Sequence, residues 1–179
     1  LAAAATQTGD PHIGLRLAAL GDLKRMGTYG YLLCNAATLE DLFRLAERYC
    51  HILIHTSAVL FQRGAKFSRC EYQVRVPARL STRHYVEWSL GVFVNAVRAR
   101  LGDNWYPEAV YFAHEAPANT RVLRRFFGDR LYFSQRANYF EFDSRLLHTR
   151  FSDGDPALLE IMKEHADRLM TALAQRDDD

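Results

Sequence analysis

The chain has 179 residues, 49% of them hydrophobic, which is enough for one domain with its own core but short for two. Its 23 lysines and arginines nearly balance its 21 aspartates and glutamates, leaving a formal net charge of +2. This balance excludes a protein whose main partner is nucleic acid or an anionic membrane. Three cysteines without metal-type spacing, and no signal peptide or apolar run of roughly 18 residues, predict a soluble, reduced, cytoplasmic protein.

The N-terminal third predicts helices. The chain opens with an uncapped alanine-rich run over residues 1–5, which is typical of a helix interior, so we expect the start of that helix to be missing. The segment from Asp10 to Leu17 predicts a turn that begins a second helix. From Thr38 to Leu53 the apolar residues recur at helical spacing. Thr38 with Asp41 three residues later forms an approximate capping box at the start of this helix.

The middle of the chain predicts a hairpin and a buried helix. Residues 57–61 and 67–76 form two predicted strands that turn near Gly64. In the second strand, apolar residues from Cys70 to Val76 alternate with charged or polar ones, which indicates one buried and one solvent-exposed face. The stretch from Ser81 to Leu101 is apolar on nearly every side. We therefore expect a central helix that packs on several faces.

The remaining elements complete a single domain. They are a strand over residues 107–114, a short helix over 119–127, and a second hairpin formed by 130–135 and 138–143. Helices and strands thus alternate in blocks rather than one by one. This order predicts an α+β fold, with a mainly antiparallel sheet of hairpins packed with the central helix and flanking helices.

A last helix begins at Asp155-Pro156, a cap followed by proline at the first helical position. Its apolar stripe consists of Leu158, Leu159, Met162, Ala166, Leu169 and Leu173. An uncovered stripe of this size at the edge of a fold is typical of a two-fold interface. We expect a homodimer that uses Leu158, Met162, Leu169 and Leu173; the alternative is that the stripe packs on the domain's own sheet.

No catalytic motif is present: the chain lacks a nucleophile elbow, a zinc-protease helix, a phosphate loop and a dinucleotide fingerprint. An enzyme is therefore not expected, and neither is a cofactor. His51 and His55, four residues apart, could share a metal ion, but no third ligand is identifiable. The simpler interpretation makes them polar residues at the C-terminus of a helix, where cations are favoured.

Three arginines recur every four residues, at Arg75, Arg79 and Arg83. Guanidinium groups suit the recognition of phosphate or carboxylate, and this spacing resembles the arginine motif of cyclic-di-GMP receptors of the PilZ class. The companion motif of that class is absent. A cyclic dinucleotide effector and a solvated charged face both stay open as interpretations.

A ligand pocket is indicated by polar groups within apolar segments. Aromatic residues make up 12% of the chain, and most are expected in the core. A buried tyrosine hydroxyl, or a carboxylate inside the most apolar helix, needs polar partners. A largely apolar cavity edged by a few such groups is typical of small-molecule sites. The predicted pocket residues, all placed on buried faces, are Tyr31, Tyr72, Tyr85, Glu87 and Trp88; the alternative is ordinary packing, with Glu87 turned to solvent.

Several short segments share their order and spacing with a known family. They are Asp10-Pro11-His12-Ile13-Gly14, Asn35-Ala36-Ala37-Thr38-Leu39, Phe112-Ala113-His114, Phe126-Phe127-Gly128 and Asn138-Tyr139-Phe140-Glu141-Phe142. Over residues 9–175 the chain resembles the N-terminal effector-sensing, arabinose-binding-like domain of AraC-type bacterial transcription regulators.

The resemblance implies a regulatory domain that binds a small-molecule effector and controls dimerisation and DNA binding. In such regulators DNA is bound by a separate C-terminal domain with two helix-turn-helix units. Because this chain stops at Asp179 without them, we expect it to be a fragment whose DNA contacts lie elsewhere. The alternative is a module that dimerises without any ligand.

Overall fold

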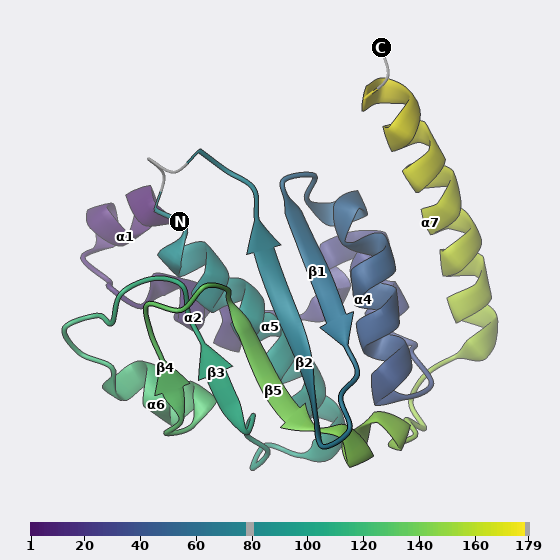
Figure 1. Ribbon diagram of the computed structural model, residues 1–179. Helices are drawn as coiled ribbons and strands as arrows, with labels where there is room; N and C mark the ends of the chain where they lie inside the picture. Colours follow the sequence, from purple (N-terminus) through teal and green to yellow (C-terminus); the bar gives the residue numbers. More distant parts are fainter. Residues whose placement is uncertain (78–80, 178–179) are drawn as a thin grey trace.

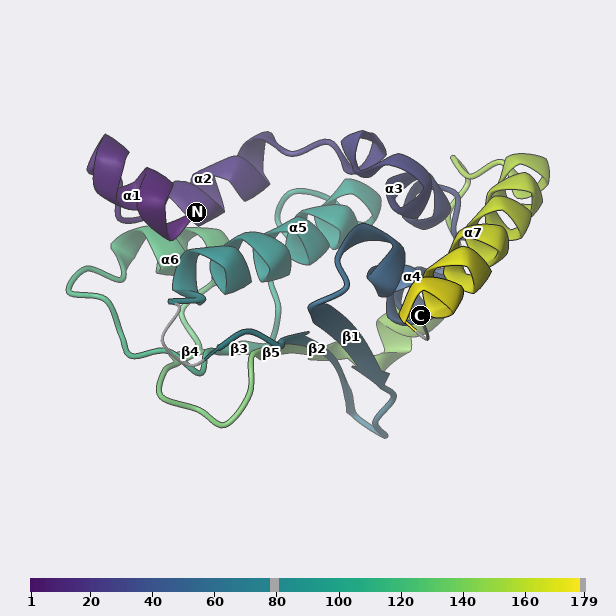
Figure 2. The ribbon, with the colours of Figure 1, turned by 90° about the horizontal axis from the view of Figure 1, so that it is seen from above.

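The structure is a computed structural model that describes residues 1–77 and 81–177. A layer of helices covers one face of a five-stranded sheet (Figure 1, Figure 2). In chain order the elements are α1 (Ala2–Thr8), α2 (Ile13–Leu20), the 3₁₀-helix η1 (Leu23–Met26), α3 (Gly27–Cys34), α4 (Leu39–Leu53), β1 (Ser57–Gln62), β2 (Phe67–Val74), α5 (Arg83–Leu101), β3 (Ala109–Tyr111), α6 (Arg121–Phe127), β4 (Leu131–Tyr132), β5 (Tyr139–Asp143), the 3₁₀-helix η2 (Ser144–His148) and α7 (Pro156–Asp177).

The predicted starts of α4 and α7 are confirmed by their caps. The Thr38 Oγ1 atom accepts a hydrogen bond from the Asp41 amide at 3.1 Å and donates one to the Asp41 carboxylate at 2.7 Å. At the start of α7, the Asp155 carboxylate accepts hydrogen bonds from the amides of Ala157 and Leu158. Each cap satisfies amides that have no partner within their own helix, and so fixes where the helix begins.

The sheet has the strand order β1-β2-β5-β3-β4. The predicted first hairpin is confirmed, because β1 and β2 pair antiparallel with Val59 opposite Tyr72. The predicted second hairpin is wrong. Strand β5 pairs with β2 and β3, whereas β4 pairs in parallel with β3, placing Leu131 beside Val110. A parallel pair requires a crossover connection, which α6 supplies here.

The two faces of the sheet differ, but less sharply than predicted. On β2 the side chains of Cys70 and Tyr72 point into the core as expected. The opposite face is not wet at Glu71, which is only 7% exposed. Its carboxylate accepts a hydrogen bond from Gln73 at 2.9 Å and pairs with Arg69 at 3.5 Å. The neighbouring Gln73 and Arg69 side chains therefore cover Glu71, a residue that the alternation of apolar and polar residues assigns to solvent.

Helix α5 lies at the centre of the helical layer, as predicted, and contacts α1, α2, α6 and β2 (Figure 2). Two glycines allow α2 and α5 to approach closely. A Cβ atom on Gly14 would lie 2.0 Å from the His84 carbonyl oxygen, and one on Gly91 would lie 2.7 Å from the Ala18 side chain. The central position of α5 thus depends on glycine at these two contacts as well as on apolar side chains.

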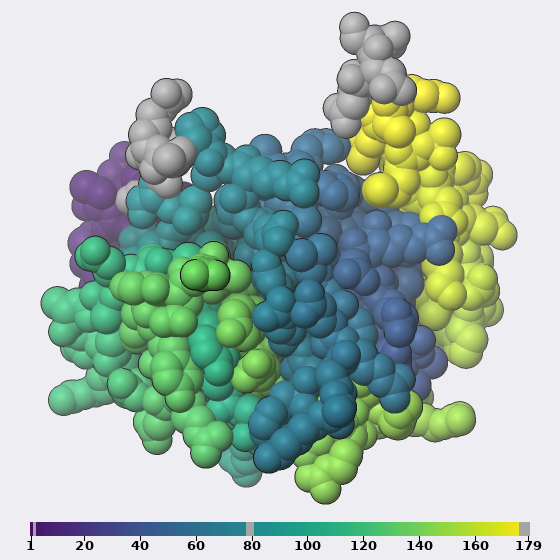
Figure 3. Space-filling view, viewed as in Figure 1, coloured from purple at the N-terminus to yellow at the C-terminus, as the bar shows by residue number. Residues whose placement is uncertain are grey.

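Helix α7 forms one edge of the molecule and packs on α3 and α4 (Figure 1, Figure 3). Leu159 and Ala166 are buried against the domain, and Met162 packs against the same core. Leu158, Leu169 and Leu173 are half-buried. The apolar stripe is therefore divided: part covers the domain's own core, and part stays accessible along the edge.

Candidate ligand-binding cavity

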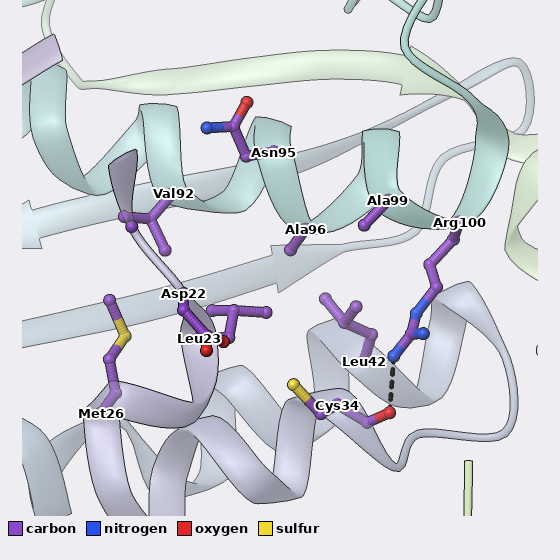
Figure 4. A pocket seen from close by; sticks show the side chains of 11 residues that line it. Asp22, Leu23, Met26, Cys34, Leu42, Val92, Asn95, Ala96, Ala99 and Arg100 are labelled. Atoms are coloured by element: carbon purple, nitrogen blue, oxygen red, sulfur yellow. Dashed lines mark hydrogen bonds between the residues drawn. The ribbon is translucent and has the colours of Figure 1, made fainter. Parts of the chain in front are cut away.

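A cavity of about 200 Å³ lies between α5 and the segment that runs from α2 through η1 to α3 (Figure 4). Its walls come from two parts of the chain, residues 21–42 and 92–100. The lining residues are Gly21, Asp22, Leu23, Met26, Cys34, Leu42, Val92, Asn95, Ala96, Ala99 and Arg100. Most of these side chains are apolar, which is the usual character of a small-molecule site.

The wall opposite α5 is set by local backbone features. Asp22 accepts a hydrogen bond from the Lys24 amide at 3.0 Å and so caps η1. Gly27 then takes a positive φ of 60°, a conformation that favours glycine, and turns the chain into α3. A Cβ atom on Gly30 would lie 1.7 Å from the Leu23 carbonyl oxygen. Glycine at this position lets η1 lie directly against α3.

The polar groups of the cavity are few and already paired. The Asn95 amide donates a hydrogen bond to the Ala18 carbonyl oxygen at 2.8 Å. Arg100 donates to the Cys34 carbonyl oxygen at 2.5 Å (Figure 4) and forms an ion pair with Asp153. Burial lowers the pKa of Arg100. The cavity therefore offers a partly desolvated cation at its rim and an apolar interior.

A second, smaller cavity of about 20 Å³ is lined mostly by buried residues. Its lining residues are Met26, Tyr29, Cys50, Leu53, Ile54, Tyr72, Trp88, Ser89, Val92 and Phe93. Beside it the Tyr72 hydroxyl donates to the Tyr85 hydroxyl at 2.9 Å, and the Ser89 hydroxyl donates to the Tyr85 carbonyl oxygen. Burial raises the pKa of Tyr72 far above its ordinary value. The Tyr72 hydroxyl is consequently neutral and can both donate and accept hydrogen bonds.

Comparison with known proteins identifies the domain. The family model described as the arabinose-binding domain of AraC transcription regulator, N-term, matches residues 1–151. The chain belongs to this family. The fold is similar to that of transcriptional regulator CdpR from Pseudomonas aeruginosa, with a TM-score of 0.67 and 16% sequence identity. At this identity the likeness shows the fold alone.

The aligned region covers 88% of this chain and 54% of the CdpR chain, so this AraC-family domain spans about half the length of that regulator. None of the curated proteins compared with the chain matches it. In the described part of the chain, no helix is long and apolar enough to cross a membrane.

Three of the five predicted pocket residues of this AraC-family domain lie together. Tyr72, Tyr85 and Trp88 are neighbours, with ring centroids 5.9 Å apart for the first two and 5.6 Å apart for the last two. Tyr31 lies elsewhere and is 38% exposed, so the prediction of a buried face is wrong for it. The buried tyrosine of α3 is Tyr29, which lines the smaller cavity.

The signal for Tyr29 was present in the sequence. Residues 29, 32, 33 and 36 recur at helical spacing, and all four are buried, whereas residue 31 lies about 200° around the helix from residue 29, on the opposite side. Sequence reasoning also missed the residues of the larger cavity. They belong to separate segments that only the tertiary fold brings together.

Glu87 occupies a separate buried cluster. Two residues from Tyr85, it lies about 200° around the helix and faces away from the tyrosines. Its side chain is 0% exposed, so the alternative of a solvated Glu87 is wrong. Arg83 donates to its carboxylate at 2.8 Å, and His114 Nε2 lies 3.5 Å from the same oxygen. Burial raises the pKa of Glu87, and Arg83 offsets part of that rise.

The arginine and histidine candidates are not gathered into a site. Arg83 is engaged by Glu87 and by the Pro11 carbonyl oxygen, and Arg75 is exposed beyond the end of β2. Arg79 lies outside the described residues. His51 lies in the last turn of α4. Within residues 1–77 and 81–177, no group of three or more histidine, cysteine, aspartate or glutamate side chains is placed to hold a metal ion.

Proposed function

We propose that this chain is the ligand-sensing domain of an AraC-type transcription regulator, and that its small-molecule effector binds in the cavity of about 200 Å³. The observation that carries this proposal is the cavity itself, an apolar space with a few convergent polar groups in a domain of this family. Binding there controls self-association, and through it DNA binding by a separate domain. No catalytic step is part of this function.

The link from the cavity to α7 supports the proposal. Arg100 lines the cavity and pairs with Asp153, which lies just before α7. The Asp155 amide donates to the side-chain oxygen of Asn35, the residue that follows α3. An effector acts on a protein only through different affinities for two states. In this proposal the two states are two positions of α7 relative to these anchors. They differ in how much of Leu158, Leu169 and Leu173 is covered in a homodimer.

A cavity-filling variant tests the site. Ala99 lines the cavity and is solvent-exposed, so phenylalanine at this position blocks the cavity without entering the core. Ala157, exposed on the first turn of α7, gives the matched control. In a thermal-shift screen of a small-molecule library, we expect some compounds to raise the melting temperature of the unmodified protein and of Ala157→Phe, but not of Ala99→Phe. Binding that is unchanged in Ala99→Phe would show that the effector site lies elsewhere.

A further inference from the structure

The larger and the smaller cavity are neighbours that share two lining residues, Met26 and Val92. Met26 belongs to η1 and reaches toward Val92 on α5, as Figure 4 shows. These side chains therefore form the partition between the cavity of about 200 Å³ and the cavity of about 20 Å³ beside Tyr72.

The two halves of this partition differ in mobility. Val92 is β-branched and is held within the central helix, where such a side chain has one strongly preferred rotamer. Met26 is unbranched, with three rotatable bonds, and methionine adapts readily to the shape of its surroundings. It ends a 3₁₀-helix of a single turn and is followed by Gly27 with its positive φ. Rotation of the Met26 side chain joins the two cavities without moving α5.

We propose that Met26 is a movable partition, and that the bound effector occupies one elongated channel from Arg100 to the hydroxyl cluster at Tyr72. This inference rests on the proposed effector-binding function and deepens it. It assigns to the site a second, inner compartment and a chemical class of ligand.

The inner end of the channel provides unused hydrogen-bonding capacity. Tyr72 and Ser89 line the smaller cavity, and the Tyr72 hydroxyl donates to that of Tyr85 beside it, so the Tyr72 oxygen can still accept a hydrogen bond. The hydroxyl of Ser57 adjoins that of Tyr72 closely enough to lower its pKa, yet forms no hydrogen bond of good geometry within the described residues, although Ser57 is fully buried. A buried unpaired hydroxyl is costly. A ligand that ends in a hydroxyl or carbonyl group would bond to this cluster.

The rest of the channel favours an uncharged, apolar body. Both charged lining residues already have partners: Arg100 forms an ion pair with Asp153, and the Asp22 carboxylate accepts a hydrogen bond from the Lys24 amide. Most of the other lining side chains are aliphatic, aromatic or sulfur-containing, and the Asn95 amide is already bonded to the Ala18 carbonyl oxygen. A sugar, with a hydroxyl on nearly every carbon, would leave most of its groups unpaired there. The ligand class is therefore an elongated, mostly apolar molecule with one terminal hydroxyl or carbonyl group.

Linear alkan-1-ols from hexan-1-ol to decan-1-ol are suitable probes, and Trp88 is a reporter within the inner compartment. In a Trp105→Phe background, Trp88 is the remaining tryptophan of the chain. We expect the longer alkanols to change its fluorescence saturably, and alkanoates of equal length to bind at least about tenfold more weakly, because a charged group finds no free partner at either end. Tyr72→Phe, which removes one hydroxyl, should weaken binding by about fivefold.

Met26→Ala removes the partition and should tighten alkanol binding by up to about tenfold, since the joined channel no longer has to be opened. Met170→Ala on α7, where the methionine also packs against the core, is the matched control and should leave affinity unchanged. Thermal melts of all variants establish that they are folded.

The outcomes separate the two proposals. In one outcome, library compounds bind and Ala99→Phe blocks them, but alkanols leave the Trp88 fluorescence unchanged both with Met26 in place and in the Met26→Ala variant. This result overturns the inner compartment and leaves the proposed effector site standing. Equal affinity for alkanols and alkanoates overturns the ligand class. If neither alkanols nor any library compound binds any folded variant, the proposed effector-binding function itself has failed.

Discussion

Three histidines with a buried ring nitrogen give the domain a pH-sensitive point that is separate from the two cavities described above. His12, His84 and His114 lie where the starts of α2 and α5 meet the loop after β3. Each has a buried ring nitrogen without a hydrogen-bond partner among the described residues. Burial lowers the pKa of all three, and the nearby charge of Arg83 lowers each of them further. The folded domain therefore keeps these imidazoles neutral.

From this follows a prediction for acid stability. The unfolded chain takes up protons near the ordinary histidine pKa of 6.5, whereas the folded chain resists them, so the free energy of unfolding falls as the pH drops below about 6.5. His114→Gln removes one of the three contributions and should reduce that fall. Urea denaturation at about pH 7 and about pH 5.5 measures the difference in the free energy of unfolding between the two pH values. His165→Gln, at an exposed histidine, is the control. An unchanged pH dependence in His114→Gln would rule out this role.

Glu87, whose carboxylate lies 3.5 Å from His114 Nε2, affects stability in the opposite direction, so the sign of the pH dependence distinguishes its effect from that of the histidines. Its raised pKa means that the folded domain holds the carboxyl proton to higher pH than the unfolded chain does. Its contribution to stability is greatest at acid pH and is lost as the pH rises from about 4.5 through the folded pKa. A loss of stability on acidification below about pH 6.5 is therefore the signature of the histidines and not of Glu87.

At the scale of elements, local patterns predicted what local physics decides. Thr38 and Asp155 fix the starts of α4 and α7 through bonds to nearby amides, and a long stretch that is apolar on nearly every side identified α5 as the central helix. The pairing of β4 was missed because a strand of two residues has no period, and its partner depends on the path of α6. The cavity was also missed, because its walls combine η1, α3, α4 and α5, which only the tertiary fold brings together.

The central position of α5 makes a second prediction. Phe93 is buried on this helix and contacts the Phe43 ring, with centroids 6.5 Å apart. Phe93→Ala removes most of a core side chain, so we expect the free energy of unfolding to fall by about 3–5 kcal/mol. Ile161→Ala on α7, at a residue that is 58% exposed, should change it by less than about 0.5 kcal/mol. Urea denaturation measures both values, and similar losses for the two variants would contradict a central α5.

At the scale of the whole molecule, α7 is fixed to the elements that enclose the cavities. Asp167 accepts hydrogen bonds from the Tyr49 hydroxyl and the Arg48 guanidinium, both at 2.9 Å, which ties the middle of α7 to α4. The start of α7 is tied to the segment after α3 through Asn35. Because α3 and α4 also line the larger cavity, a change in that cavity can reach α7 through two direct contacts.

The divided stripe of α7 makes the last prediction, which concerns self-association. Ala166 is 0% exposed and faces the domain's own core, whereas Leu169 and Leu173 are half-buried along the edge. If the edge is a homodimer seam, Leu169→Glu with Leu173→Glu should give a folded monomer, because the charges meet solvent in the monomer and apolar surface in the dimer. Ala166→Glu should instead lower the melting temperature sharply, since a carboxylate is forced into the core. Sedimentation equilibrium and thermal melts distinguish these cases. A double variant that remains dimeric with an unchanged melting temperature would exclude the edge of α7 from the interface. A double variant that unfolds like Ala166→Glu would assign all of the stripe to the core.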